Sequence, residues 1–170
     1  AAFLLPVLHK IMSMGADRAT RALIIVPTRE LAVQIDQQMQ GLSYYTPVSS
    51  IAVYGGGDGA TFSIEKTALT EGADIVICTP GRMMGYVDFT KLNFLILDEA
   101  DRMLDMGFHE DIMKIIKHVP EKRQSLLFSA TMPPKIRELA RKVMNKPEEI
   151  NLALAKPPEK ILQIAYIVYE

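Results

Sequence analysis

Short apolar runs recur along the chain, and each is continuous rather than alternating between apolar and polar residues. A continuous run of this length is typical of a strand that is covered on both faces of its sheet. The pattern therefore predicts buried strands, which we place at residues 21–26, 49–54, 74–79, 94–100 and 125–130.

Amphipathic segments lie between these runs, with apolar residues three or four positions apart, as on one face of a helix. In residues 28–42 this face contains Leu31, Ile35, Met39 and Leu42. Alternating strands and helices predict right-handed βαβ units in an α/β fold with a doubly wound, mainly parallel sheet. Ligands of such folds bind where the strands end, at the carboxyl edge of the sheet. Two further helices are expected at residues 109–119, with Ile112, Ile115, Ile116 and Val119 on one face, and at residues 133–145.

The end of the chain has a different pattern. Pro147, Pro157 and Pro158 mark a linker, and an alternating run at residues 162–168 reads as a lone strand. We therefore expect one domain over residues 1–150. Residues 151–170 are expected to be a linker and a strand that belongs to something beyond residue 170.

Composition narrows the class of protein. A chain of 170 residues suits one domain of ordinary size, and 19 Lys and Arg against 20 Asp and Glu exclude a global basic field, so any nucleic-acid contact would be local. Cys78 is the one cysteine in the sequence, which excludes a disulfide framework and a cysteine zinc cluster. With no apolar run of the roughly 20 residues that a membrane span needs, we expect a soluble, cytoplasmic protein without a membrane partner.

The run LILDEAD at residues 95–101 places three carboxylates directly after a buried strand. One interpretation is structural: acidic residues are favoured where a helix begins. The other is chemical, because carboxylates this close repel one another and raise their pKa values unless a cation offsets the charge. In nucleoside triphosphatases, an apolar strand that ends in Asp holds magnesium, and an adjacent Glu can orient the attacking water.

Four further motifs follow other predicted strands: PTRELAVQ at residues 27–34, GGG at 55–57, TPGR at 79–82 and SAT at 129–131. With DEAD at residues 98–101, their order resembles the first RecA-like domain of the DEAD-box ATP-dependent RNA helicases, over residues 1 to about 150. Details of the DEAD and SAT stretches resemble the bacterial RhlE-like branch.

The resemblance implies ATP and Mg2+ as cofactors and a role for each residue of these motifs. Asp98 would hold Mg2+ through water, and Glu99 would be the base or the positioning group for the hydrolytic water. Asp101 would form hydrogen bonds with Ser129 and Thr131, which also has physical sense, because a Ser and a Thr at the next strand end can satisfy a partly buried carboxylate. The structural alternative for SAT is a simple helix cap before Pro133 and Pro134.

The remaining motifs are implied to bind RNA. Thr28 and Arg29 open a helix, whose N-terminus favours anions, and the bare backbone of Gly56 follows a strand end. The turn of Thr79, Gly81 and Arg82 resembles a phosphate-binding edge as well. Such contacts would grip sugar and phosphate, so that binding would be largely independent of sequence. The alternative for Arg29 and Arg82 is a solvated surface arginine.

The resemblance also has a gap, because the sequence contains no Gly-Lys pair and so lacks the phosphate loop G-x-x-x-x-G-K-[ST]. Residues 1–8 resemble the segment that follows this loop in the family, so we expect the chain to be a fragment. A second RecA-like domain of the same parent chain is then implied as a partner, its first strand at residues 162–168. The segment between TPGR and the DEAD strand is shorter than usual, which predicts an omission at Met84 and Gly85.

Three functions remain open. The first is an RNA-stimulated ATPase that couples hydrolysis to local RNA unwinding or remodelling of RNA–protein complexes, with this fragment inactive alone and its RNA binding weak and salt-sensitive. The second is a non-catalytic RNA-binding or scaffold module. The third is a related helicase or nucleotide-binding protein that acts on DNA. Structural roles alone are expected for the histidines, for Met103, Met106 and Met113, and for Tyr44 and Tyr45, which we expect to be half-buried.

Overall fold

The computed structural model describes residues 2–15, 19–54, 67, 69–82 and 87–152. The expected linker and strand over residues 153–170 therefore lie outside the described residues, and so does the expected omission at Met84 and Gly85. Within the described ranges, no helix is both long enough and apolar enough to span a membrane.

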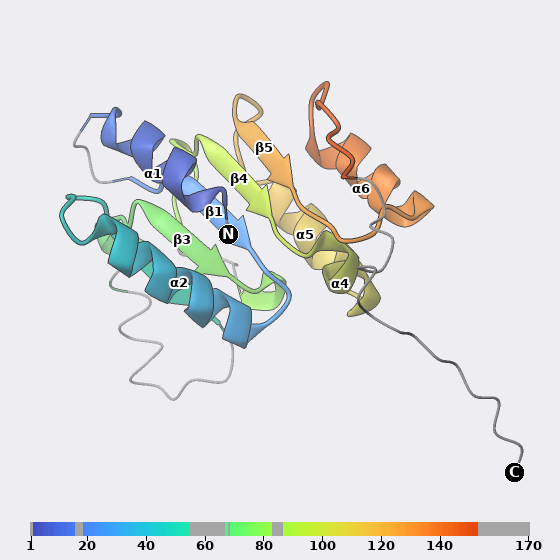
Figure 1. Ribbon diagram of the computed structural model, residues 1–170, viewed down its shortest axis with the longest axis horizontal. Coiled ribbons are helices and arrows are strands. Elements are labelled where there is room, and N and C mark those ends of the chain that lie inside the picture. The colour runs from blue at the N-terminus through green and yellow to red at the C-terminus, as the bar shows by residue number, and fades with distance from the viewer. Residues whose placement is uncertain (1, 16–18, 55–66, 68, 83–86, 153–170) are drawn as a thin grey trace, which may run out of the picture.

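A five-stranded sheet forms the centre of the domain (Figure 1). Its strand order is β2-β3-β1-β4-β5, and every neighbouring pair is parallel. The two jumps in this order are the crossovers of a doubly wound sheet, so the predicted fold class is confirmed. The strands are β1 (Ala22–Ile25), β2 (Ser50–Val53), β3 (Ile75–Cys78), β4 (Phe94–Leu97) and β5 (Gln124–Leu127).

Burial of the strands follows their place in the sheet. Every residue of β1, β3 and β4 is buried, which explains why their sequences are continuous apolar runs. The edge strands β2 and β5 are only partly covered, and β5 begins with an exposed Gln124. The buried strands β1 and β4 pair along their whole length, Ala22 with Phe94 and Ile25 with Leu97.

Two helices cover one face of the sheet (Figure 1): α1 (Leu4–Met12) and α2 (Arg29–Ser43). The face that α2 buries contains Ala32, Ile35 and Met39, which pack with alternate strand residues such as Ile24 and Ile96. Leu42 was predicted on this face, but it is 39% exposed, and Ser43 is buried instead. The prediction for Leu42 was wrong. Leu42 lies three residues after Met39 and Ser43 lies four residues after it, and in this helix the later of the two positions faces the sheet.

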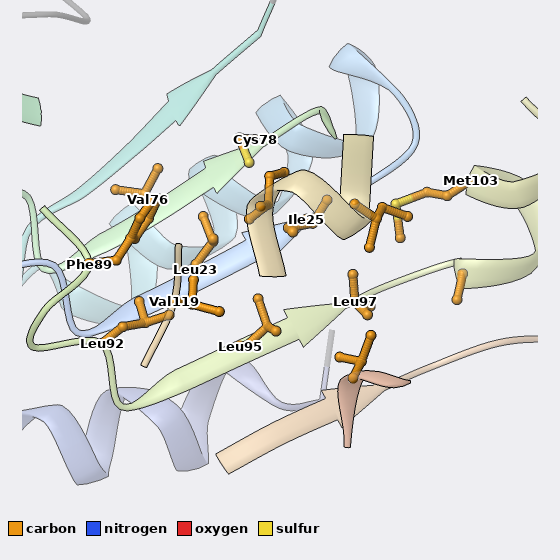
Figure 2. Close-up of a cluster of buried hydrophobic side chains, with 14 of the residues drawn as sticks. Leu23, Ile25, Val76, Cys78, Phe89, Leu92, Leu95, Leu97, Met103 and Val119 are labelled. Atoms are coloured by element: carbon orange, nitrogen blue, oxygen red, sulfur yellow. The ribbon is translucent and has the colours of Figure 1, made fainter. Parts of the chain in front are cut away.

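The opposite face is covered by α4 (Ala100–Asp105), α5 (His109–Ile116) and α6 (Pro134–Val143). Their buried residues join the other set of strand residues in a second cluster, part of which Figure 2 shows around Leu23, Leu95 and Met103. Met103 is buried there, as its predicted packing role requires, and Cys78 lies in the same cluster. Burial raises the pKa of the Cys78 thiol far above its ordinary value, so the thiol stays neutral.

Helix α5 is shorter than predicted. It ends at Ile116, which is only half-buried, whereas Ile112 and Ile115 are fully covered. Val119 is buried as expected, but it lies beyond the helix in the turn that leads to β5. The apolar spacing predicted the buried residues Ile112, Ile115 and Val119 correctly. It predicted the end of the helix incorrectly, because Val119 lies after the helix but continues its apolar spacing.

Backbone hydrogen bonds continue past the ends of the strands and bring the segments that follow them to one edge. Asp98 N donates to Ile25 O over 3.0 Å, and Val26 N donates to Cys78 O over 2.9 Å. On the far side of β4, Phe128 N donates to Leu97 O over 2.8 Å. The residues just after β1, β4 and β5 are therefore aligned at the carboxyl edge, where an α/β sheet binds its ligands.

Candidate active site

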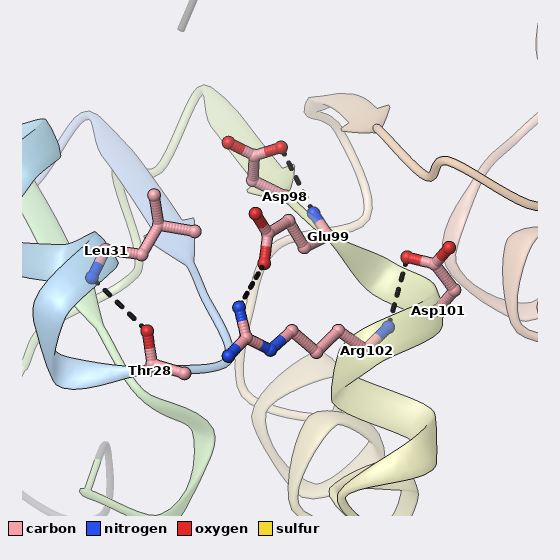
Figure 3. A network of polar contacts seen from close by, with 6 residues as sticks. All are labelled: Thr28, Leu31, Asp98, Glu99, Asp101 and Arg102. Carbon is pink, nitrogen blue, oxygen red and sulfur yellow. Dashed lines mark hydrogen bonds and ion pairs between the residues drawn. The ribbon is translucent and has the colours of Figure 1, made fainter. Parts of the chain in front are cut away.

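Asp98 and Glu99 lie at the carboxyl end of the buried strand β4, where the chain leaves the sheet for α4 (Figure 3). The side chain of Asp98 accepts a hydrogen bond from Glu99 N over 3.1 Å. No basic residue of the described chain forms an ion pair with Asp98. This carboxylate therefore lies at the edge of the sheet without an ion pair to a basic side chain of the described residues.

Partial burial of Asp98 has an electrostatic consequence. Desolvation raises the pKa of its carboxyl group above the ordinary value, and the nearby charge of Glu99 raises it further, while the hydrogen bond from Glu99 N acts in the opposite direction. A raised pKa means that the folded chain disfavours the ionised form. A cation placed at this carboxylate would relieve that cost.

Glu99 has a backbone conformation that non-glycine residues seldom adopt, with φ 52° and ψ 50°. It occupies the N-cap position of α4 but makes no side-chain capping bond. Its carboxylate instead forms an ion pair with Arg102 over 3.2 Å, in which 42% of the Glu99 side chain and 58% of the Arg102 side chain are exposed. A pair this exposed adds little stability, so the Glu99 carboxylate is free to exchange Arg102 for another partner.

Asp101 joins the first turn of α4 to the segment that follows β5. One of its carboxylate oxygens accepts hydrogen bonds from Thr131 N over 3.0 Å and from Thr131 Oγ1 over 2.9 Å. The link to Ser129 runs through the backbone: Asp101 N donates to Ser129 Oγ over 3.3 Å, and Ser129 Oγ donates to Thr131 O over 2.7 Å. Asp101, Ser129 and Thr131, for which hydrogen bonds were predicted, therefore form one hydrogen-bonded cluster. These contacts go beyond a simple helix cap.

This cluster changes the ionisation of Asp101. Desolvation raises the pKa of the carboxyl group, but hydrogen bonds from the Thr131 hydroxyl, from the backbone of Arg102 and Thr131, and from Ser129 together outweigh it. The pKa is thus below its ordinary value, and the ionised form is stabilised. Asp98 and Asp101, three positions apart, are shifted in opposite directions.

Thr28 and Arg29 begin α2 next to the same edge. Thr28 is the N-cap of this helix, and its hydroxyl accepts a hydrogen bond from Leu31 N over 3.3 Å (Figure 3). The guanidinium of Arg29 lies over the ring of Tyr54, 4.5 Å from its centroid, directly after strand β2. This contact holds the Arg29 side chain along the end of the sheet. Arg29 nevertheless remains exposed to solvent.

The turn after β3 is a short 3-10 helix, Pro80–Arg82, which begins just after Thr79. Thr79 N donates to Val53 O over 3.3 Å, which ties this turn to the end of β2. Gly81 is exposed, and a Cβ atom added there would meet no heavy atom within 4 Å. Gly56 and its two glycine neighbours lie outside the described residues, so their predicted contact with RNA stays a prediction.

Comparison with known proteins agrees with this arrangement of motifs. The profile of the DEAD/DEAH box helicase family matches residues 1–139. The chain belongs to this family. The structure of the DEAD-box splicing factor Prp28 from yeast matches 86% of the chain with a TM-score of 0.78 and 31% sequence identity, over 37% of the Prp28 chain. A five-stranded RecA-like fold is therefore shared with a DEAD-box protein of known structure.

The curated relatives are DEAD-box helicases of bacteria and eukaryotes. The ATP-dependent RNA helicase CshA of Listeria monocytogenes is 45% identical over 89% of the chain, and the ATP-dependent RNA helicase DeaD of Escherichia coli K12 is 42% identical over the same share. The ATP-dependent RNA helicase ddx46 of Dictyostelium discoideum is 42% identical over 88%. The chain spans 29%, 24% and 14% of these relatives' lengths, respectively. The finer placement in an RhlE-like branch stays a prediction.

Two contacts of this DEAD-box site were missed in the sequence. The Glu99–Arg102 pair has a sequence signal, because residues three apart on a helix are neighbours. The Arg29–Tyr54 contact has none, because it depends on β2 and β1 lying on either side of β3. The ring of Phe128, at the end of β5, also stacks on Phe3 with 5.2 Å between centroids, which brings the start of the chain to this edge.

The carboxylates of this DEAD-box site suit a Mg2+ ion that keeps several of its water ligands. Within the described ranges, no group of three or more acidic, His or Cys side chains could hold a metal ion. Mg2+ commonly keeps several waters and takes one or two carboxylates together with substrate phosphates. The half-buried Asp98, with a raised pKa and no cationic partner, suits that kind of attachment better than a closed protein cage.

Proposed function

We propose that the chain is the first RecA-like domain of an ATP-dependent RNA helicase, which couples ATP hydrolysis to local unwinding of RNA or to remodelling of RNA–protein complexes. The observation that carries the proposal is the cluster at the carboxyl edge, where Asp98 and Glu99 are exposed to a ligand and Asp101 connects them to Thr131 on the neighbouring strand end. Membership of the DEAD/DEAH box family supports the same conclusion.

In this proposal ATP and Mg2+ bind at the carboxyl edge beside β4. Mg2+ would supply positive charge to a triphosphate, and Asp98 would hold it through water. Glu99 would orient or deprotonate the water that attacks the terminal phosphate, since phosphoryl transfer depends mainly on positioning and on electrostatic stabilisation. Its exposed ion pair with Arg102 costs little to break.

RNA would bind along the same edge, further from β4. Thr28 and Arg29 at the start of α2 place backbone N–H groups and a guanidinium where phosphates could lie. Thr79, Gly81 and Arg82 form the next turn along the edge, and Gly56 is proposed to extend the contact from β2. Contacts of this kind read the RNA backbone rather than the bases.

The Asp101 cluster is proposed to transmit changes from the nucleotide site to the segment that leads into α6. Asp101, Ser129 and Thr131 connect the start of α4 with the start of α6 through hydrogen bonds of 2.7 to 3.3 Å. A shift of Glu99 on nucleotide binding would move the first turn of α4. The hydrogen bonds of Asp101 would then move the segment between β5 and α6.

The remaining machinery belongs to a longer parent protein in this proposal. The chain spans less than a third of the curated relatives named above. A phosphate loop and a second RecA-like domain would complete the nucleotide site, with residues 1–150 as the first domain and residues 151–170 as the link to the second. The 170-residue chain alone is therefore predicted to lack helicase activity. A cytoplasmic location also stays a prediction.

Substitution of Glu99 by Gln in the parent protein tests the proposal. The change keeps the size of the side chain and removes its ability to accept a proton, so RNA-stimulated ATP hydrolysis is expected to fall by about 100-fold or more. Affinities for nucleotide and for RNA should stay within about twofold of the parent values. Steady-state hydrolysis assays and fluorescence titrations measure these quantities.

Glu110→Gln is the matched control, because Glu110 is an exposed acidic residue in the first turn of α5. It should leave hydrolysis unchanged. Hydrolysis by the Glu99→Gln variant at the parent rate would show that Glu99 has another role. A parent protein that binds RNA and never hydrolyses ATP would support the non-catalytic RNA-binding module instead.

A further inference from the structure

A basic groove lies at the amino edge of the sheet, at the opposite end of the strands from the candidate active site. The groove has a volume of about 700 Å3 and is bounded by the last turn of α1 and by the first residues of β4 and β5. Its lining includes four side chains that are or can become cationic, and no carboxylate is among the described residues that line it. These four are His9, Lys10, Lys122 and Arg123.

Two of these cations are held in place by neighbouring groups. Lys10 Nζ donates to Gln124 Oε1 over 3.1 Å and lies 5.7 Å from the centroid of the Phe94 ring. The guanidinium of Arg123 donates to Ser125 Oγ over 3.2 Å and to Val143 O over 3.1 Å, as well as to Pro120 O. All of these acceptors are neutral, so none of these hydrogen bonds places a negative charge against either side chain.

Several exposed cations elsewhere on the surface are paired with acidic residues. Lys114 pairs with Asp111, and Lys142 pairs with Glu138. In contrast, Lys10, Lys122 and Arg123 form no ion pair with any carboxylate in the described part of the chain. The negative charge of Glu121 favours the charged form of Arg123, but Glu121 does not line the groove. The positive charge gathered here is therefore not offset by an ion pair within the described part of the chain.

The groove suits a chain of phosphates better than bases. Phe94 is 3% exposed, so its ring cannot stack on a base, and the polar groups beside the cations are Ser13, Asn93 and Gln124. The volume exceeds that of a single phosphate, and the groove is open along the starts of two neighbouring strands. Lysine and arginine contacts with a phosphate backbone provide affinity without sequence preference.

We propose that this groove is a second contact surface for the phosphodiester backbone of RNA, which binds a segment flanking the part that reaches the carboxyl edge. The inference rests on the proposed function, which supplies RNA as the polyanion. Each strand spans four residues, or roughly 13 Å at the usual rise, so the two edges face opposite ends of the domain. An RNA that reaches both must be long enough to pass around the domain, whereas a short single strand can occupy only one.

Nuclear magnetic resonance of the 170-residue chain tests the groove directly. The isotope-labelled chain is titrated at low salt with a short single-stranded RNA and with a longer RNA that carries a duplex arm. The longer RNA is expected to shift the backbone signals of Ser13, Lys122 and Gln124 in a saturable way. The short RNA should shift these signals less and act mainly at Thr28 and Arg29.

Removal of charge from the groove provides the matched comparison. In Lys10→Gln/Lys122→Gln, the affinity for the longer RNA should fall several-fold, and the slope of log affinity against log salt should decrease by about two. Lys114→Gln/Lys142→Gln removes the same charge from lysines that are already paired with carboxylates, and it should leave both quantities unchanged. The same variants in the parent protein provide the second measurement if the isolated chain gives no usable spectra.

Several results would overturn the inference. The first is an affinity for the longer RNA and a salt slope that do not change in Lys10→Gln/Lys122→Gln. The second is that polyglutamate or inorganic phosphate, at the same charge concentration, shifts the groove signals as much as the longer RNA does. The proposed function fails separately. If the parent protein lacks RNA-stimulated ATP hydrolysis while RNA still binds the groove, the helicase proposal is wrong and the groove stands. If no RNA binds at either edge, both are wrong.

Discussion

Asp98 and Asp101 show how one short segment gives two carboxylates opposite properties. Both follow the buried strand β4, but Asp101 receives two hydrogen bonds from Thr131, whereas Asp98 receives one from the backbone of its neighbour Glu99. As a result, the pKa of Asp98 is raised by desolvation, and that of Asp101 is lowered by its hydrogen bonds in spite of desolvation. The ionised form is therefore disfavoured at Asp98 and stabilised at Asp101.

The first prediction at this scale concerns Asp98→Asn. Because the pKa of Asp98 is raised in the folded chain, its ionised form costs stability at neutral pH. The neutral variant should therefore have a higher free energy of unfolding than the parent chain at pH 7. The difference should disappear near pH 3, below the ordinary aspartate pKa of about 3.9, where the parent carboxyl is protonated in both states.

Urea unfolding at the two pH values measures this difference. Asp105→Asn is the control, because Asp105 is exposed at the end of α4 and should show no comparable gain. A variant at position 98 that is less stable than the parent chain at pH 7 would contradict the assignment of Asp98 as an uncompensated carboxylate.

At the scale of elements, the Asp101 cluster connects α4 to the segment between β5 and α6. Few other polar contacts join these parts, since α4 is only six residues long and its N-cap makes no side-chain hydrogen bond. The pairing of Ala100 N with Phe128 O over 3.0 Å adds one backbone link beside the cluster. The start of α4 therefore depends on Asp101 as well as on apolar packing.

Asp101→Asn should lower the free energy of unfolding by about 1–2 kcal/mol at pH 7, because hydrogen bonds to a charged acceptor are lost or weakened. The pKa of Asp101 is lowered in the folded chain, so its contribution is present above the unfolded pKa and is lost as the pH falls through the folded value. The gap between variant and parent should thus close as the pH falls below the ordinary aspartate pKa of about 3.9.

Thermal or urea unfolding across this pH range checks the prediction. Thr131→Val removes only the hydroxyl donor and keeps the backbone N–H, so it should cause a smaller loss than Asp101→Asn. Equal stability of all three proteins at pH 7 would mean that the cluster does not stabilise the fold.

The elements themselves were largely predictable from the sequence. Continuous apolar runs gave the five strands to within a few residues, because β1, β3 and β4 are covered on both sides. Exposure at helix ends was harder to predict. Tyr44 and Tyr45 were expected to be half-buried, but they are 76% and 95% exposed, packed edge to face against each other beyond α2. Their exposure depends on where α2 ends, which apolar spacing does not fix.

At the scale of the whole molecule, the candidate active site and the basic groove lie at opposite ends of one parallel sheet. The carboxyl edge collects the DEAD-box motifs, because every strand runs in the same direction. Motif order was enough to predict that edge and the contact between Asp101 and Thr131. The basic groove could not be predicted, since Lys10 and Lys122 are far apart in the chain and line one groove only because the last turn of α1 lies beside the start of β5.

Strand order explains the other contact that was not foreseen. Arg29 and Tyr54 meet across the end of β3, which enters the sheet between β1 and β2 although it follows both in the sequence. Sequence motifs predict which residues reach an edge, whereas the order of strands decides which of them are neighbours. The spacing of the RNA-binding groups along the edge therefore depends on the fold.

The central claim is that the carboxyl edge hydrolyses ATP in response to RNA, and one measurement tests it most directly. The rate of ATP hydrolysis by the parent protein is measured without nucleic acid, with single-stranded RNA and with DNA of the same sequence. The account predicts a rate increase of about tenfold or more with RNA and little change with DNA. Equal stimulation by DNA, or no hydrolysis with either, would contradict it.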